Sequence, residues 1–81
     1  MEMREFLELI AAAKHGFKCP GLSLENLHDF QSIVALGKHA FELGYIDAFQ
    51  PHQESYTGHR LCDAFLVGGV TDEGREFLSR R

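Results

Sequence analysis

The chain lacks tryptophan, has only two cysteines among 81 residues, and contains no apolar run near the roughly 20 residues that span a bilayer. Cys19 and Cys62 are too few for a disulfide framework. A signal peptide begins with basic residues followed by an apolar segment. The first residues of this chain do not follow that order, since they include Glu2, Glu5 and Glu8. We therefore expect a cytoplasmic protein with reduced thiols and no membrane partner.

An excess of positive charge is also missing. Eight Lys and Arg stand against 12 Asp and Glu, so the formal net charge is -4. Such a chain is steered away from phosphate backbones and toward basic protein surfaces. Five His are present, and these gain protons below about pH 6.5. The length and the 44% hydrophobic content predict one globular domain, residues 1–81, with a core rich in its seven Phe.

Hydrophobic periodicity predicts helices over most of the first half. Apolar residues recur at helical spacing over residues 2–14, and Gly16 is a plausible stop before a loop at 18–27. Ser23 is a suitable N-cap for a short helix at 24–28, followed by a longer helix at 29–43. One bent helix is the alternative. Gly44 suits the helix end, and the cost of Gly37, about 1 kcal/mol relative to Ala, indicates close backbone packing there.

After Gly44 the hydrophobic period changes to two. This predicts strands at 45–49 and 61–67, joined by a polar loop at 51–60. Thr71 is then a suitable N-cap for a last helix. Aromatic residues of the hairpin either close the core or form an exposed interface, and the sequence leaves both open: Tyr45, Phe49 and Phe65.

Two segments carry a family resemblance. Residues 41–46 (FELGYI) and 70–78 (VTDEGREFL) resemble the segments before and after the wing of small bacterial and prophage-encoded winged-helix proteins, many of them uncharacterised. The resemblance implies a helix-rich α+β winged helix with three N-terminal helices, a two-stranded hairpin wing and a C-terminal helix. It also implies a DNA-binding transcription regulator that meets duplex DNA, as a homodimer, through the 29–43 helix and the 51–60 wing.

The candidate contact residues lie on the outer face of the long helix and on the wing. Gln31 is suited to reading adenine and Ser32 to touching a base or a phosphate. Lys38 is the only firm cation on the helix, whereas Asp29 and Glu42 repel phosphate, and Glu54 offsets the wing cations. The full set is His28, Gln31, Ser32, Lys38, His39, Glu42, His52, His59 and Arg60. A second hypothesis follows from the charge: an acidic protein-interaction module, such as an adaptor or a phage-type inhibitor, that binds a basic surface instead of DNA.

No pattern for catalysis stands out. Gly37-Lys38 resembles the end of a phosphate loop, but Ser32 replaces the first glycine and no strand precedes it. We therefore expect no enzyme activity and no cofactor. His52, His59 and Cys62 are of metal-ligating types, yet a fourth ligand and a Cys-x-x-Cys pair are absent from the sequence, so no metal site is predicted.

Overall fold

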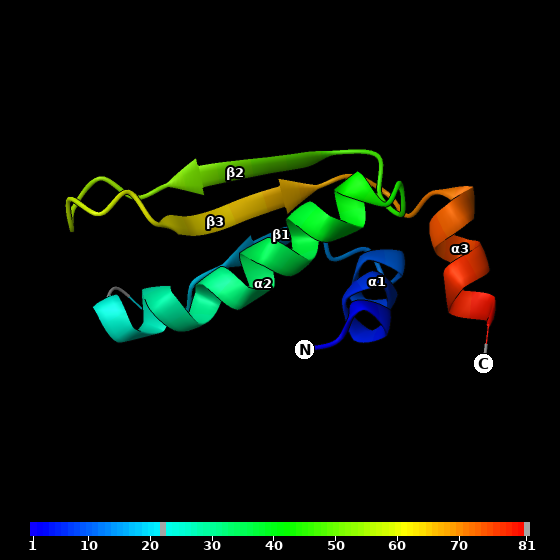
Figure 1. Cartoon of the computed structure of the whole chain (residues 1–81), viewed down its shortest axis with the longest axis horizontal. Helices are drawn as coiled ribbons and strands as arrows, with labels where there is room; N and C mark the ends of the chain where they lie inside the picture. Colours follow the sequence, from blue (N-terminus) through cyan, green and yellow to red (C-terminus); the bar gives the residue numbers. More distant parts are fainter. Residues whose placement is uncertain (22, 81) are drawn as a thin grey trace.

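The computed structural model describes residues 1–21 and 23–80; Leu22 and Arg81 lie outside the described part. The protein has a small α+β fold in which three strands form one antiparallel sheet of order β1-β3-β2. Figure 1 shows α2 running alongside this sheet, with α1 and α3 at one end and the β2–β3 loop at the other. The elements in chain order are α1 (Met3–Ala11), β1 (Gly16–Lys18), α2 (Leu24–Glu42), β2 (Phe49–Gln53), β3 (Cys62–Val67) and α3 (Asp72–Ser79).

Side-chain caps define the helix ends that the sequence predicted. The Ser23 hydroxyl accepts a hydrogen bond from the Asn26 amide at 3.1 Å and begins α2. The Thr71 hydroxyl accepts one from the Gly74 amide at 3.1 Å and begins α3. Gly44 ends α2 at φ +77°, the left-handed conformation that glycine adopts without strain. All three predictions are confirmed.

Helix α1 ends earlier than predicted and is followed by a strand that the sequence did not reveal. Ala13 adopts φ 75°, and the Lys14 amide donates to the Leu9 carbonyl at 3.0 Å, which closes the helix end. The chain then enters β1, where the prediction had placed a helix stop and a loop. Three residues are too few to show the alternation of apolar and polar side chains that marks a strand in a sequence. The strand is defined instead by its pairing with β3, in which Phe17 lies opposite Phe65.

Helix α2 is continuous, so the prediction of separate helices at 24–28 and 29–43 is wrong and the single-helix alternative holds. No Gly or Pro precedes Gly37 within the helix to interrupt it. A Cβ atom at Gly37 would lie 3.0 Å from ring carbons of both Phe49 and Phe65, which confirms the close packing predicted there.

The first hairpin strand is displaced from its predicted position. Strand β2 begins at Phe49 instead of Tyr45, and residues 50–53, predicted mostly as loop, belong to it. Tyr45 instead stacks on Phe77 of α3, with ring centroids 5.0 Å apart. Pro51 is accommodated because β2 lies at the edge of the sheet, where one side of the strand needs no hydrogen-bond partner. The β2–β3 loop therefore spans residues 54–61, and this segment is called the wing loop below.

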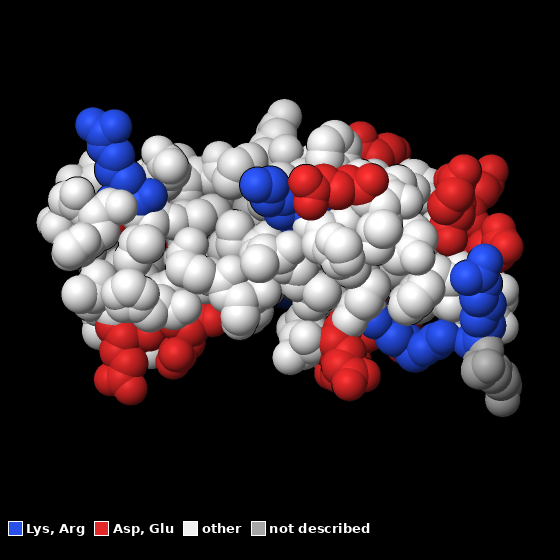
Figure 2. Space-filling view, viewed as in Figure 1, with Lys and Arg blue, Asp and Glu red and all other residues white. Residues whose placement is uncertain are grey.

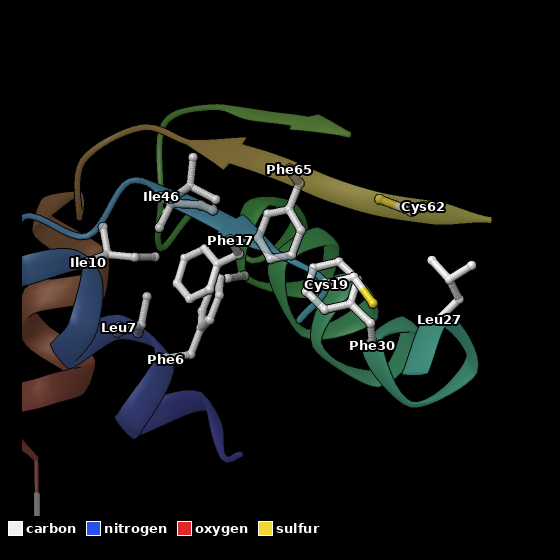
Figure 3. Close-up of a cluster of buried hydrophobic side chains, with 12 residues drawn as sticks. Phe6, Leu7, Ile10, Phe17, Cys19, Leu27, Phe30, Ile46, Cys62 and Phe65 are labelled. Carbon is white, nitrogen blue, oxygen red and sulfur yellow. The ribbon is translucent and has the colours of Figure 1, made fainter. Parts of the chain in front are cut away.

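Phenyl rings form the centre of the core, as the composition predicted. Phe65 of β3 is 1% exposed, and its ring lies 5.0–6.2 Å from four others, those of Phe6, Phe17, Phe30 and Phe49. Figure 3 shows Phe6, Phe17, Phe30 and Phe65 converging between the sheet and the helices. Phe49 and Phe65 thus close the core. Within residues 1–21 and 23–80, no helix combines the length and apolar character needed to cross a bilayer.

Candidate functional site

Five of the six candidate residues on α2 are exposed, namely His28, Ser32, Lys38, His39 and Glu42. They do not form one cluster. A helix rises 1.5 Å per residue, so His28 and Glu42 are separated by about 21 Å along the axis. The candidates therefore mark a long helix face that would suit an extended partner better than a small molecule.

Gln31 is the exception on this helix. Its Nε2 donates to the Leu27 carbonyl at 2.8 Å and to the Cys62 carbonyl at 2.7 Å, while the Cys62 amide donates to its Oε1 at 3.3 Å. The side chain is only partly exposed and joins α2 to the start of β3. This corrects the prediction that Gln31 lies on the outer face: both ends of its amide are already used by the fold.

The exposed surface of α2 is acidic. Glu25, Asp29 and Glu42 are all exposed, and Lys38 is the only Lys or Arg in the helix. Among the described residues, none of these four side chains takes part in a salt bridge. Figure 2 shows positive side chains gathered beside the C-terminal end of the chain and only scattered elsewhere on the visible face. The helix offers a field that repels phosphate and attracts cations.

The wing loop is closed by a buried carboxylate. Glu54 is 2% exposed, and it accepts hydrogen bonds from the Thr57 amide at 2.9 Å, the Thr57 hydroxyl at 2.7 Å and the Leu61 amide at 3.1 Å. Loss of hydration opposes its ionisation, but the bonds from Thr57, Leu61 and Tyr56 outweigh this and lower the pKa of Glu54. Glu54 was predicted to offset the wing cations; its lowered pKa keeps the negative charge in the loop, but the carboxylate is buried and bonded to the loop itself.

The remaining wing candidates are exposed but differ in their surroundings. His59 and Arg60 lie at the tip, where Arg60 adopts φ 55°, and Tyr56 beside them is 51% exposed. His52 lies on the strand below, with its Nδ1 2.8 Å from Oδ1 of Asp63. The tip thus presents a guanidinium, an imidazole and a phenol, whereas His52 belongs to the sheet.

The three potential metal ligands are not brought together. His52 pairs with Asp63, and the Cys62 thiol is buried and donates to the Ala64 carbonyl at 3.2 Å. In the part of the chain that the structure describes, no group of three His, Cys, Asp or Glu side chains is placed to hold a metal ion. Burial raises the pKa of the Cys62 thiol, so the thiolate form that binds metals is disfavoured.

Sequence reasoning missed a second surface, the outer face of the sheet. Leu66 is 58% exposed at its centre, between Gly16 of β1 and Gln50 of β2. Alternation along residues 61–67 places Leu66 on the opposite face from Phe65, but it fails at Asp63, where a β-bulge interrupts the pairing with β2. The face could not be assembled from the sequence because β1 was not recognised and β2 was displaced.

No family model, curated protein or solved structure matches this chain.

Proposed function

We propose that this protein is a winged-helix-type domain that binds a basic protein surface through the exposed face of α2. The fold assignment is supported by the order of α2, the β2–β3 hairpin and α3, together with the winged-helix resemblance of residues 41–46 and 70–78. The continuity of α2 supports the choice of partner. Without a turn, the chain has no separate recognition helix of the type that enters the DNA major groove.

The observation that carries the proposal is the charge on α2. Glu25, Asp29 and Glu42 project from the exposed helix, and Lys38 alone offsets them. Phosphate groups approaching this face meet a net repulsion, whereas Lys and Arg side chains are attracted. Exposed charges act over about 10 Å at 0.1 M salt, so binding should weaken as salt is added.

The test is an NMR titration of the isotope-labelled protein with a synthetic decalysine peptide. Amide shifts should change along the outer face of α2, at His28, Ser32, Ala35 and His39, and the changes should shrink with added salt. Neutralising the helix acids (Glu25→Gln, Asp29→Asn and Glu42→Gln together) should reduce the affinity at least about fivefold.

The matched control removes the same charge from α1, through Glu2→Gln, Glu5→Gln and Glu8→Gln together. These carboxylates are exposed and lie outside the α2 face. The proposal requires the control to retain more affinity than the α2 variant. Equal losses in the two variants, or shifts confined to other elements, would show only nonspecific attraction to an acidic protein and would overturn it.

Duplex DNA is the second candidate partner, and the exposed Arg60 and His59 at the wing tip favour it. Fluorescence anisotropy with a mixed-sequence duplex at about 20 and 200 mM NaCl separates the two candidates. The protein-binding proposal expects no complex at either salt concentration. A complex that weakens steeply with salt and is lost in Arg60→Ala would establish the DNA function instead.

A further inference from the structure

The outer face of the sheet is uncovered. Phe17 and Phe65 point from β1 and β3 toward the helices, and the residues that alternate with them point to the other side. A shallow groove of about 390 Å³ crosses this side. Leu66 at its centre is 58% exposed, the highest fraction among the large hydrophobic side chains described. The other outward residues are Gly16, Lys18, Gln50, His52 and Ala64.

A β-bulge adds a carboxylate to this face. The register shifts between His52, which pairs with Ala64, and Gln53, which pairs with Cys62, so Asp63 is the extra residue. Strict alternation would point Asp63 to the same side as Phe65. Instead its carboxylate meets His52 Nδ1 at 2.8 Å. The face therefore has a cation, Lys18, at its β1 edge and a carboxylate toward its β2 edge.

We propose that this face binds a second copy of the chain, sheet against sheet, about a two-fold axis parallel to β3. The register places outward residues in two rows across the strands, Gly16–Leu66–Gln50 and Lys18–Ala64–His52. Rotation about this axis places β1 of one copy over β2 of the other. Each row of one copy therefore lies over the same row of the second copy, with its residues in the opposite order across the sheet. Leu66 then meets Leu66 of the second copy.

The reversed rows are complementary in size and in charge. Gly16 faces Gln50 of the second copy, so a residue without a side chain lies opposite a long one. Lys18 faces the His52–Asp63 pair of the second copy, and the symmetry produces this contact twice. Two sheets pack about 10 Å apart with their strands roughly aligned, a distance that Lys18 and the side chains facing it cover together. This self-complementarity selects a second copy as the occupant.

The dimer is weak. Three short strands offer less area than a standard protein interface, so we expect a dissociation constant on the order of 100 µM. The surface is separate from the outer face of α2, and the dimer does not depend on the proposed function of that helix.

Sedimentation velocity from about 10 µM to about 1 mM tests the proposal. The native chain should shift from monomer to dimer across this range. Leu66→Lys should weaken dimerisation at least about tenfold, because it places two like charges at the centre. Leu43→Lys is the matched control: it is 45% exposed outside the sheet and should dimerise normally. A monomer at 1 mM, or a dimer unaffected by Leu66→Lys, overturns the proposal.

Charge reversal tests the orientation of the two copies. Lys18→Asp and Asp63→Lys should each weaken the dimer, and the double variant should recover affinity because the cross-copy pairs are restored with inverted sign. In a mixture of differently labelled chains, Leu66 methyl groups should show intermolecular contacts with Leu66. A double variant weaker than both single variants, or contacts that omit Leu66, contradicts this arrangement.

Discussion

Replacing Phe65 with Ala tests the packing that holds the sheet to the helices. The side chain is 1% exposed and its ring lies within 6.2 Å of four other phenyl rings. Truncating a buried Phe costs about 3–5 kcal/mol, through lost transfer free energy and the cavity left behind. A chain of this length has a total stability of about 4–12 kcal/mol. Phe65→Ala should therefore remove about a quarter or more of the stability and lower Tm by at least about 12 °C.

The assay is urea denaturation followed by circular dichroism, at a concentration where the chain is monomeric. Leu66→Ala is the matched control, since this neighbour lies on the same strand but points outward; its cost should stay within about 0.5 kcal/mol. Phe65→Leu, at about 1–3 kcal/mol, provides a measurable value if Phe65→Ala does not fold. A cost below about 1 kcal/mol for Phe65→Ala would refute the central place of this ring in the core.

Three further predictions concern local structure. Ala13→Gly should raise the stability in urea by about 0.5–1 kcal/mol, because glycine relieves the φ of 75°; a loss would contradict this account of the helix end. Glu54 has a lowered pKa, so the stability it contributes is present above its ordinary value of 4.5 and is lost as the pH falls below it. Glu54→Gln should accordingly flatten the fall in stability between about pH 5 and pH 3, and an unchanged slope would exclude this role. Gln31→Ala should cost about 1–3 kcal/mol and speed hydrogen exchange at the Cys62 amide, which a purely DNA-reading side chain would not do.

The predictable parts of this fold are those set by local chemistry. Ser23 and Thr71 cap helices because a hydroxyl placed before the first turn satisfies a free amide. Gly44 ends α2 because it adopts a positive φ without a side-chain clash. The packing at Gly37 was also predictable, since a glycine within a helix costs stability that close contact must offset. Each of these signals lies within a few residues of the feature it defines.

The parts that could not be predicted depend on contacts distant in sequence. Strand β1 exists because Phe17 pairs with Phe65, and the start of β2 depends on Tyr45 being held against Phe77. The predicted division of residues 24–43 into two helices is wrong because the residues contain no helix breaker at that point. At the candidate surfaces, charge counting set Glu54 against the wing cations without showing whether its carboxylate is buried or exposed. Its burial is visible only once the loop closes around its carboxylate.

The acidic face of α2 is proposed to bind a cationic protein surface and not DNA. The most direct measurement compares Glu42→Lys with the native chain in binding to decalysine and to duplex DNA at about 20 mM salt. We expect weaker binding of the peptide by the variant and no DNA complex with the native protein. A native DNA complex that is strengthened by Glu42→Lys would contradict it and identify α2 as a DNA-contacting helix.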